Sequence, residues 1–138
     1  MIILDTNVIS EVMRPTPNAA VAEWLRGRPL GELATTTVTV AETRYGLARL
    51  APGRRRADLE AKFANFLGRG FANRIFSFDA LAAEAYGELV AARERAGRRL
   101  DGFDGLIAAI ARSRGFALAT RDVEDFADCG IEVFAPWG

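Results

Sequence analysis

The amino-acid sequence predicts an α/β domain in which a mostly parallel sheet carries helices on both faces. Short apolar runs, which are typical of buried strands, alternate with longer segments whose apolar residues recur at helical spacing. The predicted order is a strand followed by two helices, three times over, and then two further strands. Helices between successive strands are the usual connection of a parallel sheet. With 50% hydrophobic and 26% charged residues among 138, the composition is that of an ordinary globular domain, and we expect one domain over 1–138.

The first predicted unit has a strand at 2–4 and helices at 6–13 and 19–26. The strand is uniformly apolar. Pro15 and Pro17 end the first helix, because proline lacks the N–H that a helix interior needs. Asn18 is a favourable N-cap for the second helix.

The second predicted unit has a strand at 33–38 and helices at 40–50 and 54–67. The strand is rich in threonine and valine, which favour extended backbone. Pro52 and Gly53 separate the two helices, and the second begins with the basic run 54–56.

The remaining predicted elements are strands at 74–78, 116–120 and 131–134 and helices at 80–97 and 104–114. Asp79 is a favourable N-cap for the first of these helices. Gly97 and Gly115 stand where the two helices are expected to end.

Four acidic residues stand near the predicted strand ends. Asp5 directly follows the first strand, Glu42 begins the helix after the second, and Asp122 follows the strand 116–120. Asp104 opens the helix that leads into that strand. In open α/β sheets ligands bind outside the carboxyl ends of the strands, so these side chains could converge there. A cluster with oxygen ligands alone suits Mg²⁺ or Mn²⁺.

Helix capping is the alternative explanation of each acid. Asp5 could cap the helix that follows it, and Asp122 could cap a short turn after it. Thr39 and Glu42 have the spacing of a capping box. Asp104 lies in a first helical turn, where the helix dipole favours an anion. Residue types and spacing leave both explanations open.

The composition excludes several kinds of chemistry. The chain has no histidine and a single cysteine, Cys129, which excludes an internal disulfide, zinc fingers and histidine-based catalysis. Catalysis would have to use carboxylates, hydroxyls, amides and arginine. The N-terminus has no charged leader, and no apolar run approaches the roughly 18 residues of a membrane span, so we expect a cytoplasmic protein without membrane contact.

Four segments resemble, in order, the motifs of PIN-domain ribonucleases. These segments are 3–10 (ILDTNVIS), 37–42 (TVTVAE), 104–111 (DGLIAAIA) and 119–122 (ATRD). The resemblance is strongest to VapC-type toxins of bacterial toxin-antitoxin pairs, in their FitB-like branch, and it extends over the whole chain to Pro136 and Trp137. It implies a single PIN domain over 1–138.

The resemblance also implies which residues form the site. The catalytic and metal-binding residues would be Asp5, Glu42, Asp104 and Asp122, with Thr6, Asn7 and Thr120 as supporting polar residues. Asp101 and Asp125 lie nearby and are interpreted as caps or surface acids.

The activity implied is that of an endoribonuclease in which Mg²⁺ or Mn²⁺ activates water to hydrolyse RNA, with tRNA as a possible substrate. The implied partners are a cognate antitoxin and a second copy of the chain in a homodimer. If four of the 18 acidic residues hold metal, 14 remain to oppose 18 basic residues, and that surplus favours phosphate binding. The apolar side chains of the first two helices could line a groove for the antitoxin or pack in the core: Val8, Ile9, Val12, Met13 and Trp24.

Two other function classes share some of these sequence features. A phospho-receiver module also gathers acids and Mg²⁺ but needs a lysine at a strand end, and the only lysine, Lys62, lies within a predicted helix. A catalytically silent PIN scaffold that binds RNA or a partner protein remains the alternative.

Overall fold

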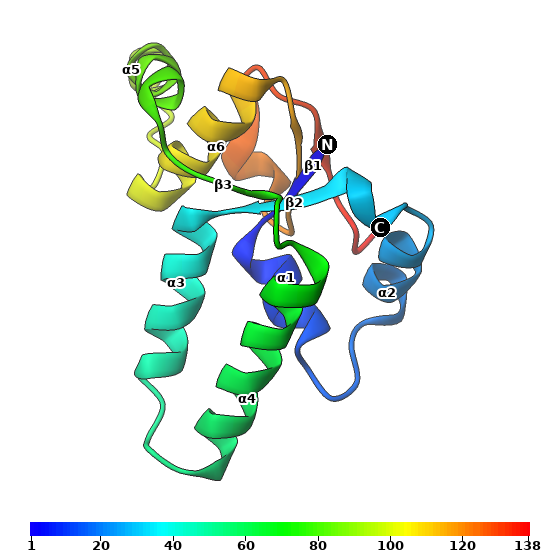
Figure 1. Cartoon of the computed structure of the whole chain (residues 1–138). Coiled ribbons are helices and arrows are strands. Elements are labelled where there is room, and N and C mark those ends of the chain that lie inside the picture. Colours follow the sequence, from blue (N-terminus) through cyan, green and yellow to red (C-terminus); the bar gives the residue numbers. More distant parts are fainter.

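A five-stranded sheet runs through the centre of the computed structural model, which describes residues 1–138 (Figure 1). Its strands lie in the order β3-β2-β1-β4-β5, and every neighbouring pair is parallel. Leu4 of β1 stands opposite Ala119 of β4, so the two strands end side by side. The strands are β1 (Ile2–Leu4), β2 (Leu33–Thr36), β3 (Ile75–Phe76), β4 (Ala117–Ala119) and β5 (Val133–Phe134).

Six helices cover both faces of the sheet, which confirms the predicted fold class and order of elements. In Figure 1 the sheet is seen nearly edge-on, with α5 and α6 above it and the other four helices below. None of the six has the length and apolar character that crossing a membrane requires. The helices are α1 (Thr6–Val12), α2 (Ala19–Arg26), α3 (Thr37–Ala48), α4 (Arg54–Asn65), α5 (Ala80–Arg95) and α6 (Gly102–Arg114).

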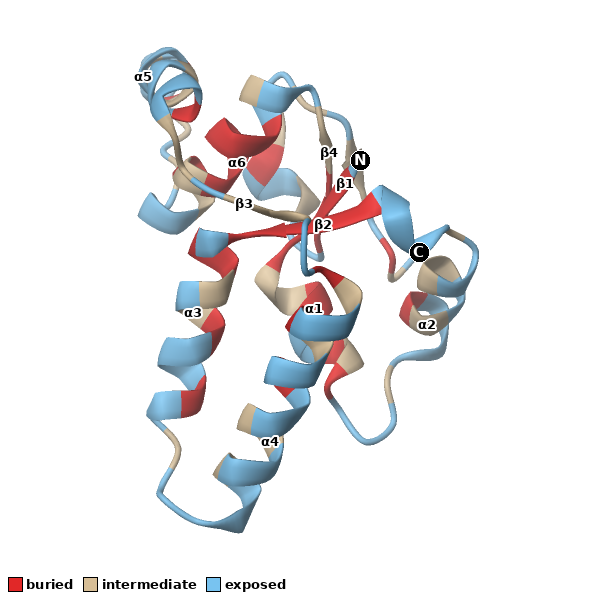
Figure 2. Ribbon diagram, viewed as in Figure 1, coloured by how far each residue is buried: buried red, intermediate tan, exposed pale blue.

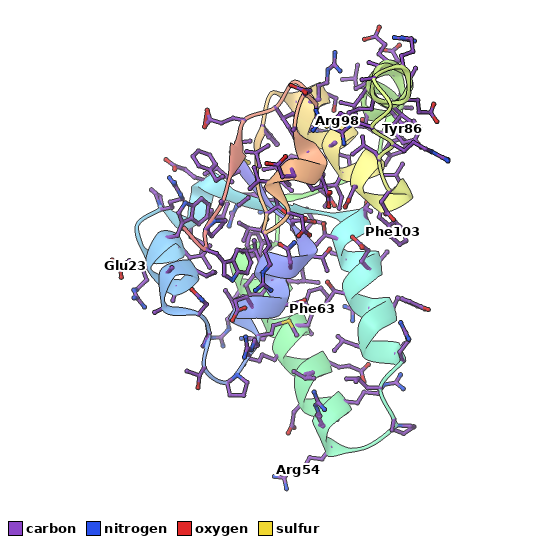
Figure 3. The ribbon with its side chains drawn as sticks, turned by 180° about the vertical axis from the view of Figure 1, so that it is seen from behind. Glu23, Arg54, Phe63, Tyr86, Arg98 and Phe103 are labelled. Carbon is purple, nitrogen blue, oxygen red and sulfur yellow. The ribbon has the colours of Figure 1, made fainter.

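The core is divided by the sheet into two apolar clusters (Figure 2). Successive residues of a strand point to opposite faces, so Ile3 packs with Ile107 and Ile110 of α6. Leu4 belongs to the other cluster, with Phe63 of α4, which is labelled in Figure 3. The proposed partner groove on α1 and α2 is largely part of this core. Three of its side chains are buried there and two pack against it: Val8, Ile9 and Met13, then Val12 and Trp24.

The boundary between β2 and α3 differs from the prediction. The strand ends at Thr36 rather than at residue 38, and the helix begins at Thr37. Thr36 is the N-cap, because its hydroxyl oxygen accepts the backbone N–H of Thr39 at 3.0 Å. The alternative in which Thr39 and Glu42 form a capping box is therefore wrong. Glu42 lies in the second turn of the helix, and its carboxylate takes no part in capping the helix.

The start of α6 also differs from the prediction, by two residues. The helix begins at Gly102, and Asp101 caps it by accepting the backbone N–H of Phe103 at 3.0 Å. This confirms the interpretation of Asp101 as a cap. Asp104 stays in the first turn and accepts no capping hydrogen bond.

Candidate active site

The carboxyl ends of β1 and β4 open into a polar cavity of about 550 Å³. None of its ten lining residues is hydrophobic. The structure brings all four predicted acids to this cavity from four segments that are far apart in the sequence. The lining residues are Asp5, Thr6, Asn7, Ser10, Glu11, Arg14, Glu42, Asp104, Arg121 and Asp122.

Asp5 is held from both sides by hydrogen bonds. One carboxylate oxygen accepts the backbone N–H of Thr6 at 2.8 Å, which caps α1, and the other accepts the hydroxyl of Thr120 at 2.8 Å. Burial raises the pKa of Asp5, the two hydrogen bonds oppose that rise, and the negative charges of neighbouring aspartates add to it. Asp5 is therefore a cap that also faces the cavity, so capping and ligand binding are compatible for this residue.

Glu42 reaches the same cavity from α3. One of its carboxylate oxygens accepts the hydroxyl of Thr6 at 2.9 Å. Burial is the largest cause of the raised pKa of Glu42, and the Thr6 hydrogen bond opposes it. Thr6 thus donates its backbone N–H to Asp5 and its hydroxyl to Glu42, so one residue fixes the positions of two carboxylates.

Asp122 is placed by Asn7 and Thr120. The Asn7 amide nitrogen donates to a carboxylate oxygen of Asp122 at 3.2 Å, and the Asp122 backbone N–H donates to the Thr120 hydroxyl oxygen at 3.1 Å. Asp122 stands at the start of the short turn η3 (Val123–Phe126), but its side chain makes no capping hydrogen bond there. The capping alternative is thus wrong for Asp122. Thr120 is fully buried and connects Asp122 to Asp5 beneath the cavity.

Asp104 differs from the other three acids because its half-buried carboxylate accepts no hydrogen bond from the protein. Burial raises its pKa to about 7, and the charges of Asp5, Asp101, Asp125 and Glu42 add to the effect of burial. A half-buried anion among other anions needs either a proton or a cation to compensate its charge. Asp104 is the carboxylate of this cavity with the strongest requirement for such a counter-charge.

The four carboxylates line one cavity without forming a tight cage: the structure holds no group of three or more acids gathered closely enough for one metal ion. An all-oxygen donor set still fits Mg²⁺ or Mn²⁺, because Mg²⁺ keeps several waters and usually binds through one or two carboxylates. The free oxygens of Asp104 and the second oxygen of Glu42 supply such ligands. Asp101 and Asp125 are exposed and do not line the cavity.

Four lining residues were not predicted: Ser10, Glu11, Arg14 and Arg121. Glu11 is buried and accepts the guanidinium of Arg14 at 3.2 Å and the backbone N–H of Asn18 at 3.0 Å, which joins the end of α1 to the start of α2. The spacing of three residues between Glu11 and Arg14 is a sequence signal for this pair. Arg121 has no comparable signal beyond its position next to Asp122.

A family model and several known proteins match this chain over nearly its whole length. The family model of the PIN domain matches residues 2–131. The plasmid stability protein StbB of Pseudomonas syringae pv. tomato is 44% identical over 99% of both chains. The VapC ribonuclease Y4jK of Sinorhizobium fredii is 37% identical over 99% of this chain and 98% of its own. Toxin FitB of Neisseria gonorrhoeae is 38% identical over 99% of both chains.

A solved structure supports the same assignment. The structure of FitAB bound to the IR36 DNA fragment contains a chain with a TM-score of 0.94 and 38% identity, matched over 100% of this chain and 96% of that one. The family model matches nearly the whole chain, and the relatives are more than 30% identical to it. Both findings agree with the fold and with the polar cavity. The chain therefore belongs to the PIN-domain family.

Proposed function

We propose that this protein is a metal-dependent endoribonuclease and acts as the toxin of a toxin-antitoxin pair. The observation that carries the proposal is the convergence of Asp5, Glu42, Asp104 and Asp122 on one cavity that has no hydrophobic lining residue. Relatives that are named VapC ribonuclease and toxin FitB, each matched over nearly the whole chain, support ribonuclease activity and the toxin role.

The four acids would supply the ligands of Mg²⁺ or Mn²⁺, one or two of them in direct contact and the others through water. Asp104 is the first candidate for direct contact, because its oxygens have no protein donor. Asp5 remains a candidate because a carboxylate has about four lone-pair sites and its two hydrogen bonds use two of them. Glu42 and Asp122 complete the set, each with one oxygen that the hydrogen bonds to Thr6 and Asn7 leave free.

Hydrolysis of a phosphodiester needs a deprotonated water and compensation of the charge on the phosphate. A bound divalent metal supplies both, because it lowers the pKa of water and attracts the phosphate oxygens. The contribution of the protein is to hold the carboxylates in fixed positions: Thr6 orients Asp5 and Glu42, while Asn7 and Thr120 orient Asp122. With no histidine in the chain, carboxylates are the side chains available to accept a proton near neutral pH.

The partners proposed are an RNA substrate and an antitoxin. An arginine from an antitoxin would pair bidentately with a carboxylate such as Asp104 and compete with the metal. A tRNA substrate and a homodimer stay predictions from the family resemblance. The competing proposal is a catalytically silent PIN scaffold that binds RNA or a partner without cutting.

Cleavage of RNA by the purified protein is expected to require a divalent metal. Total RNA incubated with Mn²⁺ or Mg²⁺ should be cut, EDTA should abolish cutting, and excess metal should restore it. Gel electrophoresis of the RNA measures the result. Protein with Asp5→Asn, purified in parallel, controls for contaminating ribonucleases. Cutting that persists undiminished in EDTA would falsify the metal mechanism, and intact RNA under every condition would favour the silent scaffold.

A further inference from the structure

Two cationic side chains line the polar cavity, Arg14 from the turn that ends α1 and Arg121 from the segment between β4 and η3. They differ in how their charge is compensated. Arg14 forms a salt bridge with the buried Glu11, with an N···O distance of 3.2 Å. The exposed guanidinium of Arg121 makes neither a hydrogen bond nor a salt bridge, although Asp122 follows it in the chain. Arg121 is therefore the one uncompensated cation at this cavity.

The position of Arg121 is fixed by contacts at both of its ends. Its backbone N–H donates to the side-chain oxygen of Asn7 at 3.1 Å, and the same Asn7 holds Asp122. Its guanidinium carbon lies 5.2 Å from the centre of the Trp137 ring. Trp137 is half-buried and packs against the apolar cluster formed around β1 and α1. A guanidinium that stacks on a ring keeps the N–H groups at its edge available to an acceptor.

We infer that Arg121, oriented by Trp137, binds a phosphate of the RNA strand next to the bond that is cut. The inference rests on the proposed function. A strand that enters a cavity lined by carboxylates is repelled by them, and a free guanidinium at the margin is suited to bind a phosphate with two parallel N–H donors. Contacts of this kind position a strand without reading its sequence. Arg121 is then a substrate-binding residue, and Trp137 is a positioning residue that acts through it.

The test compares Arg121→Ala, Arg121→Lys and Trp137→Leu with a matched control, Arg26→Ala. Arg26 is also an exposed arginine, but it lies on α2, pairs with Glu23 at 2.8 Å and does not line the polar cavity. The measurement is the initial rate of Mn²⁺-dependent cleavage of total RNA at limiting substrate, over salt concentrations from about 50 to about 200 mM. Melting curves establish that each variant is folded.

Arg121→Ala is expected to lower the rate about tenfold, which corresponds to one lost contact of about 1.4 kcal/mol. The slope of log rate against log salt should become shallower by about 0.7, the value for one phosphate contact on a single strand. Arg121→Lys should keep the wild-type slope with an intermediate rate, since it retains the charge but not the planar donor pair. Trp137→Leu should behave like Arg121→Lys, and Arg26→Ala should match the wild type.

A wild-type rate and salt slope for Arg121→Ala would overturn the inference, as would equal effects of Arg121→Ala and Arg26→Ala. If the wild type cuts no RNA, the proposed function is wrong, and this result is distinct from a failure of the inference on Arg121. Binding of a fluorescent single-stranded oligouridylate in EDTA, followed by anisotropy over the same salt range, then tests the contact without cleavage. There too, an unchanged salt slope for Arg121→Ala would refute the phosphate contact.

Discussion

Replacing Asp104 with Asn is expected to lower the rate of RNA cleavage by about 100-fold or more, the scale of losing one electrostatic catalytic group. The substitution removes the negative charge that has no hydrogen-bond donor in the protein, and it keeps the size and shape of the side chain. Because no protein hydrogen bond is lost, we expect the folded variant to be at least as stable as the wild type. Initial rates with total RNA at saturating Mn²⁺ measure the loss.

Asp101→Asn is the matched control for this experiment. Asp101 lies three residues earlier, is exposed and does not line the cavity. It caps α6, a role that Asn fills about as well as Asp. The same change of charge at this neighbouring position should leave the cleavage rate within about threefold of the wild type, because screening weakens the interaction of an exposed charge with the cavity. Equal losses in both variants would contradict a specific role for Asp104.

The metal-free protein is expected to lose stability as the pH rises from about 5 to about 8. The folded protein holds the pKa of Asp104 at about 7, against 3.8 for the free group. The folded state therefore binds more protons between these values, and stability falls as the pH rises through about 7. The raised pKa values of Asp5 and Glu42 act in the same direction. Allowing for partial solvent exposure, we expect Asp104 to contribute on the order of 2 kcal/mol to the fall.

Urea denaturation in EDTA at pH 5 and at pH 8 measures this effect. Asp104→Asn should be more stable than the wild type at pH 8, where the wild-type carboxylate is charged. The difference should shrink at pH 5, where the carboxyl of Asp104 is protonated in the wild type. A wild type that is equally stable at both pH values, with no gain from Asp104→Asn at pH 8, would show that this carboxylate lies in a well-solvated position.

Much of the fold could be predicted because its signals are local. Asn18 and Asp79 mark helix starts through their own side chains, and the structure shows both as N-caps. The boundary at residues 36–39 could not be located in this way. Thr36 and Thr39 are both acceptable N-caps, and the run of β-branched residues between them suits either a strand or a helix start. Pairing in the sheet determines this boundary, because Thr36 is the last residue of β2 and lies opposite Phe76 of β3.

The candidate site could be predicted in part for a similar reason. Asp5 and Asp122 follow strands, and the carboxyl ends of neighbouring parallel strands meet at one edge. The hydrogen bonds that orient the acids join residues far apart in the chain, such as Asn7 to Asp122 and Thr6 to Glu42. Which residues pair in these hydrogen bonds depends on tertiary packing, and no local sequence pattern indicates that packing. Arg121 could not be predicted as a site residue, because its contact with Trp137 depends on the final turn of the chain.

The central claim is that these carboxylates bind a divalent metal, and the metal-induced shift of the melting temperature tests it most directly. A ligand that binds only the folded state adds about 2.7 kcal/mol at a hundredfold excess over its dissociation constant. We expect Mn²⁺ to raise the melting temperature of the wild type and of Asp101→Asn by several degrees at pH 8. We also expect Asp104→Asn to melt higher than the wild type in EDTA and to gain little from Mn²⁺. A wild-type shift in Asp104→Asn, or no shift in the wild type, would contradict the claim.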